Sequence, residues 1–529
     1  MEKLDKLKRM LASGTIDRRE FMGRALAAGA TVALASTLAS TALKAATPKK
    51  GGKLRIGIGA GSTTDTLDPA TFTDNYMQFV GYGLRNHLTE VSNTGELIPE
   101  LAESFDASPD AVTWTFKLRK GIEFHNGKTL DADDVVTSIN HHRGEDSTSA
   151  AKAILASIES VKADGKDTVV FKLSGGSADF PYLVSDYHVA IMPAKDGKLD
   201  PLSGVGTGSY ILQSYEPGVR AKLKRNPNYW KAGRGHFDEA EALVITDVTA
   251  RTNALSTGEI DAMDRSDIKT VHLLKRRKGI RIEETSGTQH FTFAMHTDKA
   301  PFDDNHVRLA LKYAVDREAL LKTILRGHGV LGNDHPIGRS NFYHASDLPQ
   351  RAYDPDKAKF HLKKAGLSSL KLDLSAADAA FGGAVDAAVL YKEHAAKAGI
   401  EINVVREPND GYWSNVWLKK PWSAVYWGGR PTEDWMFSTA YAEGVPWNDT
   451  YWSHKRFNEL LVIARAELDQ AKRREMYFEM QKIVSDEGGV VVPMFANYVF
   501  AMSDKVQHDE MSADKDLDGT KGMERWWFA

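Results

Sequence analysis

Apolar residues recur along this chain with two different periods. Between positions 307 and 326 they return every three or four residues, the spacing of a helix that buries one face, at Val307, Leu311, Ala314, Val315, Leu320, Leu321 and Ile324. Trp114, Phe116 and Leu118 instead alternate with polar residues, so one face of a strand would bury all three. The chain therefore mixes helices and strands, and the pattern predicts an α/β fold.

The second half of the chain alternates predicted strands and helices. The pattern assigns strands to 370–374, 400–405 and 423–427 and helices to 356–365, 385–398 and 457–486. This order is typical of an α/β lobe. Further strands are predicted at 53–58 and, as a hairpin, within 161–173. Roughly 480 residues follow position 46, more than one core usually serves, so we expect two or three domains.

Two adjacent arginines stand near the beginning of the sequence. Arg18 and Arg19 are followed by Phe21 and by a mild, alanine-rich apolar run over 25–42. This pattern predicts a twin-arginine signal peptide over 1–46, cleaved within 40–46, and hence a periplasmic mature protein. The run is too weak for a membrane span, which needs ~20 strongly apolar residues. The alternative is an arginine pair that occurs by chance in an N-terminal helix.

Composition narrows the function classes further. Residues 1–46 contain eight basic and four acidic side chains, so the remaining chain has 60 basic and 67 acidic residues and a charge near −7. Such a surface repels nucleic acid and anionic lipid, and we expect no nucleic-acid partner. The chain has no cysteine, which excludes disulfides, thiolate metal sites and an acylated N-terminal cysteine. We therefore expect a freely soluble periplasmic protein, not a lipoprotein.

No pattern for metal binding or catalysis stands out. His141 and His142 are adjacent on a predicted helix, so their rings diverge and cannot both hold one ion. The zinc-binding H-E-x-x-H pattern and the G-x-S-x-G nucleophile elbow are both missing from the sequence. The sequence predicts a protein that is not an enzyme and that needs neither a metal nor a cofactor.

Candidate ligand-binding residues cluster after the strand predicted at 423–427. Gly428 and Gly429 let the backbone approach a ligand closely, and ligands of α/β lobes lie beyond strand ends. Aromatic residues gather in the same region, and Trp413, Tyr426 and Trp427 are our candidates for the cleft, with core packing as the alternative. Weaker candidates lie elsewhere: Ser62 and Thr63 in a glycine-containing loop after the first strand, and Gln289.

Several motifs occur in a fixed order from about residue 51 to the C-terminus. They include segment 113–127, Thr66-Leu-Asp-Pro-Ala70, Gly204-Val-Gly-Thr-Gly-Ser-Tyr210, Arg225-Asn-Pro-Asn-Tyr-Trp230 and Ala314-Val-Asp-Arg-Glu318. In this order they resemble the solute-binding proteins of peptide/nickel/opine-type ABC importers, family 5. Local physics explains most of them as fold determinants; for example, we expect Gly204, Gly206 and Gly208 to allow a tight loop with positive φ values.

The resemblance implies a two-lobed clamp, the type II (cluster C) periplasmic-binding-protein fold. Lobe I would consist of 47–85, 204–290 and 499–529, with a subdomain inserted at 86–203, and lobe II of 291–498. The chain would cross between the lobes near 288–297 and 495–500. It also implies a monomer that closes over a small-molecule ligand and docks on the transmembrane subunits of an ABC permease.

Arg430 departs from the pattern of the peptide-binding relatives. Those proteins have an Asp three positions after the tryptophan that Trp427 matches, and that Asp holds the ammonium of the peptide. A guanidinium there suits a carboxylate or a phosphate. Glu433 and Asp434, just beyond, are candidates for an ammonium or for sugar hydroxyls; the alternative is that they pair with Arg430 in a rigid turn.

We therefore expect the ligand to be a small organic solute that bears a carboxylate or a phosphate, as an opine-like or sugar-acid-like compound does. One alternative keeps the fold and makes the ligand a dipeptide or oligopeptide, whose ammonium Glu433 or Asp434 would hold. Another, from a different class, is a chemoreceptor-linked or chaperone-like binding module that transports nothing.

Overall fold

The structure is a computed structural model that describes residues 21–22, 24–25, 48–409 and 412–529. The twin-arginine motif at Arg18 and Arg19 and the cleavage region 40–46 lie outside the described residues. Within the described part, no helix combines the length and the apolar character that a membrane crossing requires.

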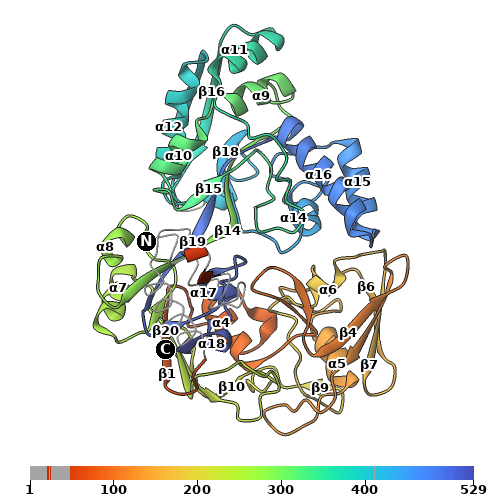
Figure 1. Cartoon of the computed structure of the whole chain (residues 1–529). Coiled ribbons are helices and arrows are strands. Elements are labelled where there is room, and N and C mark those ends of the chain that lie inside the picture. Colours follow the sequence, from red (N-terminus) through yellow and green to blue (C-terminus); the bar gives the residue numbers. More distant parts are fainter. Residues whose placement is uncertain (1–20, 23, 26–47, 410–411) are drawn as a thin grey trace.

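Two lobes share one sheet, with the order β10-β11-β12-β1-β13-β19-β14-β18-β16-β17 and with β15 beside β19 (Figure 1). Lobe I, at the bottom of the figure, begins with β1 (Lys53–Ile58), a 3-10 helix (Pro69–Thr71) and α4 (Asn75–Leu84). It continues with β10 (Tyr210–Glu216), β11 (Arg220–Arg225), β12 (Glu239–Val244), α7 (Val248–Thr257), β13 (Ala262–Met263) and α8 (Val271–Leu274). The chain end adds β20 (Val506–Gln507), α17 (Asp516–Gly519), α18 (Gly522–Arg525) and β21 (Trp527–Phe528).

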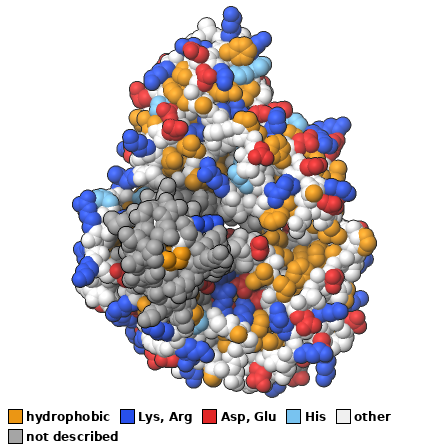
Figure 2. Space-filling model, in the orientation of Figure 1, with side chains coloured by type: hydrophobic (Ala, Val, Ile, Leu, Met, Phe, Trp, Pro, Cys, Tyr) orange, Lys and Arg blue, Asp and Glu red, His pale blue; other side chains and the backbone are white. Residues whose placement is uncertain are grey.

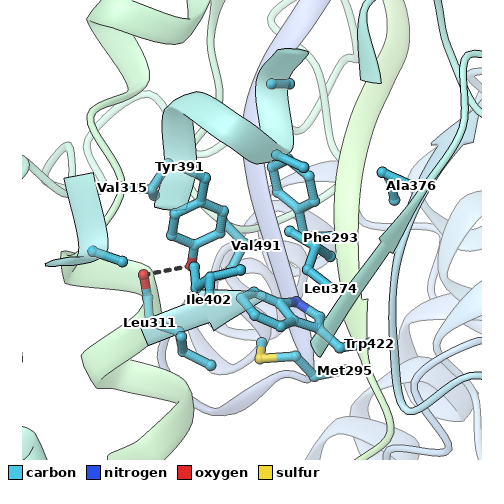
Figure 3. Close-up of a cluster of buried hydrophobic side chains, with 14 of the residues drawn as sticks. Phe293, Met295, Leu311, Val315, Leu374, Ala376, Tyr391, Ile402, Trp422 and Val491 are labelled. Atoms are coloured by element: carbon cyan, nitrogen blue, oxygen red, sulfur yellow. Dashed lines mark hydrogen bonds between the residues drawn. The ribbon is translucent and has the colours of Figure 1, made fainter. Parts of the chain in front are cut away.

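Lobe II, at the top of the figure, contains β15 (Gly329–Leu331), β16 (Leu370–Ala376), β17 (Ile400–Arg406) and β18 (Trp422–Trp427). Its helices are α9 (Asn305–Tyr313), α10 (Arg317–Thr323), α11 (Pro355–Lys364), α12 (Ala384–Ala396), α13 (Tyr412–Asn415), α14 (Glu433–Ala440), α15 (Lys455–Ala466) and α16 (Gln470–Glu487). Its core packs α10 and α12 against the sheet: Tyr391 donates to the Leu311 carbonyl at 2.7 Å beside Phe293, Leu374 and Trp422 (Figure 3).

Two long antiparallel strands connect the lobes, β14 (Ile280–Met295) and β19 (Val490–Ser503). Phe291 and Phe293 lie in the core of lobe II, whereas Phe500 and Met502 lie in the core of lobe I. The register between the two strands shifts between Ser286 and His290. The polypeptide thus crosses between the lobes as a paired ribbon, which is interrupted where the lobes meet.

A further unit, with a sheet of its own in the order β4-β5-β7-β6, is attached to lobe I (Figure 1). It comprises β2 (Thr89–Val91), β3 (Leu97–Pro99), β4 (Ala102–Ala107), β5 (Thr113–Leu118), α5 (Ala132–His141), β6 (Ile158–Ala163), β7 (Thr168–Leu173), α6 (Phe180–Leu183), β8 (Ala194–Lys195) and β9 (Lys198–Leu199). Lys231 attaches it, since its Nζ lies 2.7 Å from Glu90, 2.5 Å from Glu100 and 3.3 Å from Glu524. We call this unit the inserted subdomain.

Two segments that were predicted to form one helix each form two helices, so these predictions were wrong. The single helix expected over 307–326 is two helices, because Asp316 accepts a hydrogen bond from the backbone of Ala319 and caps α10. The one expected over 457–486 likewise divides into α15 and α16, with Asp469 as the N-cap of the second. A helical period alone does not show where such a cap restarts the helix.

The glycine-rich loop 204–208 needs its glycines for two different reasons. Gly204 has a positive φ of 68°, as expected. Gly206 and Gly208 do not, and that part of the prediction was wrong. A Cβ at Gly206 would lie 2.2 Å from the Leu84 carbonyl oxygen, and one at Gly208 2.4 Å from that of Gly83. Close packing on the end of α4 requires these two.

Candidate functional site

The loop after β18 leaves lobe II beside the strand ribbon. Trp427, the last residue of β18, is the antiparallel partner of His290 on β14. A Cβ at Gly429 would lie 1.6 Å from Oγ1 of Thr288, so only glycine fits there without displacing the backbone. Gly428 has open space, with Arg430 Nη1 as the nearest atom at 3.9 Å. The predicted close approach is therefore a requirement of Gly429 alone, and its neighbour is the interlobe ribbon.

Arg430 stands at the interlobe gap. Its Nη1 donates to the carbonyl oxygens of Gly428 at 2.9 Å and Gly429 at 3.2 Å, and it forms no ion pair with a described residue. Burial lowers its pKa from the usual value, and the nearby Tyr187 and Asp186 of the inserted subdomain oppose that shift. The guanidinium thus lies near two groups of the inserted subdomain, and only part of its hydrogen-bonding capacity is used.

Glu433 and Asp434 do not pair with Arg430. Glu433 starts α14, is buried, and accepts a 2.6 Å hydrogen bond from the Tyr343 backbone; burial raises its pKa to about 7. Asp434 pairs with Arg465 at 3.1 Å, and burial raises its pKa to about 6. Both carboxylates therefore make contacts within lobe II, and the rigid-turn alternative for Arg430 is not what the structure contains.

The three aromatic candidates separate onto two faces of β18. Trp413 and Tyr426 are 39% and 40% exposed, and their ring centroids lie 5.4 Å apart. Trp427 is only 6% exposed and packs in the lobe II core, where its Nε1 donates to Asp449 at 3.2 Å. Trp427 therefore has a packing role in this structure, whereas Trp413 and Tyr426 present open aromatic surface.

The candidates from lobe I and the ribbon lie apart from the interlobe cavity. Ser62 and Thr63 are exposed in a turn in which the Ser62 backbone donates to Asp65 at 2.7 Å, and Gly218 packs against that turn. Gln289 is half-buried on β14. None of these three lines the cavity described next.

A narrow cavity separates the start of α14 from lobe I. Lobe II contributes Pro431 and Trp435, which both follow Arg430 in the sequence. The inserted subdomain and lobe I contribute Tyr82, Val91, Tyr182, Ser185 and Asp186, and the C-terminal segment contributes Ser512, Asp514, Lys515, Gly519, Lys521 and Arg525. None of these C-terminal residues was predicted to belong to the site, since the segment has neither an apolar period nor a motif and only the fold brings it to the gap.

The histidines of α5 have partners that explain them. His141 lies 2.9 Å from the Asp68 carboxylate, and His142 lies 2.7 Å from the Ser149 hydroxyl. Across the described ranges, no three His, Cys, Asp or Glu side chains are placed to hold a metal ion. Acidic and basic side chains are interspersed over the face that Figure 2 shows.

Three comparisons place the chain among known proteins. The family model described as bacterial extracellular solute-binding proteins, family 5 Middle, matches residues 96–449. The dipeptide-binding protein of Escherichia coli (strain K12) is 29% identical over 451 residues, which cover 77% of this chain and 83% of that protein.

Two solved structures share the fold. HbpA2 from Haemophilus parasuis has a TM-score of 0.80 at 21% identity, over 90% of this chain and all of that one. The periplasmic binding protein AgaA of A. tumefacien R10, in complex with agropinic acid, has a TM-score of 0.71 at 23% identity, over 90% and 99% of the two chains. The predicted type II periplasmic-binding-protein fold is confirmed, and the chain belongs to the bacterial extracellular solute-binding proteins of family 5.

Proposed function

We propose that this protein is the periplasmic binding component of an ABC importer for a small organic solute that bears a carboxylate or a phosphate. The observation that carries the proposal is Arg430, a guanidinium at the interlobe gap that forms no ion pair with the described residues. A desolvated guanidinium binds planar oxyanions with two parallel hydrogen bonds. The AgaA complex, whose ligand agropinic acid is an acid, supports this ligand class.

A peptide is the second candidate ligand. The dipeptide-binding protein of E. coli supports it through 29% identity over most of both chains. The contacts of Glu433 and Asp434 within lobe II weigh against it, because a peptide ammonium would have to compete with Arg465 for Asp434. The free carboxylate of a peptide would still suit Arg430, so the two candidates differ mainly at the ammonium end of the ligand.

A thermal-shift screen followed by calorimetry separates the candidates. The panel contains dipeptides, the same dipeptides with an amidated C-terminus, and amino-acid–sugar conjugates with and without their carboxylate. A ligand at one hundred times its Kd stabilises the protein by ~2.7 kcal/mol. Arg430→Ala should abolish the response to acidic ligands, and Arg276→Ala, at an exposed arginine outside the cavity, should preserve it. A neutral ligand that binds both proteins equally would refute the proposal.

The proposal includes export by the twin-arginine route. Changing both Arg18 and Arg19 to Lys should retain the precursor in the cytoplasm, because that pathway reads the arginine pair. Cell fractionation with an antibody against the mature protein measures this. Export of the double variant at the normal level would rule out the route and leave the ligand proposal intact.

A further inference from the structure

The C-terminal wall of the cavity contains an unusual backbone turn. Four consecutive residues have left-handed φ values: Leu517 at 54°, Asp518 at 65°, Gly519 at 67° and Thr520 at 58°. Left-handed conformation is unfavourable for every residue that has a Cβ. Three of the four have one, so the surrounding structure must hold the turn in place. Strained backbone of this kind concentrates at ligand clamps and other functional sites.

The contacts around this turn hold it firmly against lobe I. Arg525 is the central group: its Nη1 donates to Asp518 Oδ1 at 3.1 Å and its Nη2 to Glu90 at 2.8 Å. The same Asp518 oxygen accepts a 2.8 Å hydrogen bond from the Ser512 backbone. The turn therefore fixes the positions of the two lysines that flank it, Lys515 and Lys521.

The two lysines differ in their partners. Lys521 lies 3.2 Å from the Glu90 carboxylate and 4.7 Å from the ring of Tyr82, so the inserted subdomain neutralises its charge. Lys515 lies 4.3 Å over the ring of Tyr187 and forms no ion pair with a described residue. The packing of the turn explains Lys521 and Arg525, but it does not use the charge of Lys515.

Lys515 lines the cavity from one lobe, and Arg430 of the other lobe directly precedes the lining residue Pro431. Both charges act on Asp186, and Arg430 also acts on Tyr187, the ring that Lys515 covers. Asp186 is already engaged, since its Oδ1 lies 2.6 Å from His188 Nδ1 and accepts from the His188 backbone at 3.0 Å. Asp186 and Asp514 are the carboxylates that line the cavity, and neither forms an ion pair with Lys515 or Arg430, which have no ion-pair partner among the described residues.

We propose that Lys515 and Arg430 together form an anion-binding subsite that is completed only when the lobes close, and that the acidic group of the ligand lies between them above Tyr187. This inference rests on the proposed function and extends it. Lobe II supplies a planar guanidinium, lobe I supplies an ammonium held by the left-handed turn, and the ligand anion bridges the two. A neutral solute of the same shape leaves both cations unpaired.

The test uses succinate as the probe and succinamide, its uncharged isostere, as the control probe. Melting temperature is measured on the full mature protein with each probe at constant ionic strength, for wild type, Lys515→Gln, Arg430→Gln and Lys515→Arg. Lys505→Gln is the matched control, because Lys505 is an exposed lysine of the same C-terminal segment that does not line the cavity. Baseline melting without probe shows whether each variant folds.

We expect succinate but not succinamide to raise the melting temperature of wild type and of Lys505→Gln. Lys515→Gln and Arg430→Gln should each weaken the apparent affinity for succinate about tenfold or more, the usual effect of losing a hydrogen bond to a charged group. Lys515→Arg should retain most of the response. It keeps the inference testable if Lys515→Gln folds poorly.

The outcomes separate this inference from the proposal that it extends. If Arg430→Gln loses the response and Lys515→Gln keeps it, the anion site stands and the role of Lys515 is refuted. If succinate stabilises every variant equally, or does not stabilise wild type, the two-cation subsite is refuted. In that case the ligand screen with larger acids still decides the proposed function separately.

Discussion

A buried ion pair joins the inserted subdomain to lobe II. Asp179, just before α6 of the inserted subdomain, lies 2.7 Å from Arg473 on α16 of lobe II, and each side chain is only 7% exposed. Beside it the Ala178 backbone donates to the Arg465 carbonyl at 2.7 Å, and a Cβ at Gly176 would lie 2.8 Å from Cβ of Ala466. These contacts exist only while the lobes are closed, so Asp179→Asn should favour the open form.

The magnitude follows from the burial of the pair. Breaking a buried ion pair by removing one charge costs ~3–5 kcal/mol. Asparagine keeps the shape of the side chain and still accepts a hydrogen bond, so we take the lower value, about 3 kcal/mol. In the open form water solvates Arg473, and the cost therefore falls on the closed form. A shift of about 3 kcal/mol corresponds to a factor of roughly 150 in the closing equilibrium.

Small-angle scattering and calorimetry measure this shift. The radius of gyration of the ligand-free protein should increase in Asp179→Asn, and the Kd of any ligand found by the screen should rise by up to about a hundredfold. Asp167→Asn is the control, because Asp167 forms an exposed pair with Lys120 within the same subdomain, 3.4 Å apart. A folded Asp179→Asn protein with unchanged radius and Kd would show that this pair does not govern closure.

Three further changes test other parts of the structure. Gly429→Ala should displace the loop after β18 and weaken ligand binding, because the new Cβ would collide with Thr288 of the interlobe ribbon. Gly428→Ala should bind ligand normally, and calorimetry measures both variants. Glu433 has a pKa of about 7 in the folded protein against an ordinary 4.5, so the native state binds the extra proton and stability falls as pH rises between these values. Glu433→Gln should remove that loss. In urea unfolding, the free energy of unfolding of the variant relative to wild type should be higher at pH 8 than at pH 5, and an equal difference at both pH values would refute the prediction. Lys231→Met should lower stability by ~3–5 kcal/mol because the buried Glu100 and Glu524 lose their lysine, whereas Glu90 keeps Lys521 and Arg525. Lys120→Met, at an exposed lysine, should leave the urea midpoint nearly unchanged.

Local chemistry allowed much of the fold to be predicted from sequence. The strand at 53–58 appears as β1 with the same bounds, and the helix predicted over 356–365 appears as α11, Pro355–Lys364. These features depend on neighbouring residues only. The failures at 307–326 and 457–486 have the same origin, since Asp316 and Asp469 are caps inside an unbroken apolar period.

The site was harder to predict because its walls come from distant parts of the chain. The glycine loop and Arg430 follow a recognisable strand end, and the structure places them at the interlobe gap. Lys515 has no sequence signal: it follows an irregular segment, and its position depends on a left-handed turn that Arg525 and Glu90 stabilise from other elements. A lysine that lacks an ion-pair partner can be recognised only when the side chains around it are known.

The two interlobe contacts act on closure in opposite directions. The buried pair of Asp179 and Arg473 favours the closed form whether or not a ligand is bound. Arg430 and Lys515 would oppose it, because closing brings their two positive charges toward each other and removes water from both. An anion between them converts that repulsion into attraction, so the same residues that recognise the ligand would also determine when the lobes close. The double variant Asp179→Asn, Lys515→Gln separates these effects. If they are independent, the change in the free energy of closing equals the sum of the two single changes, and a large deviation would mean that the two contacts are coupled through the inserted subdomain.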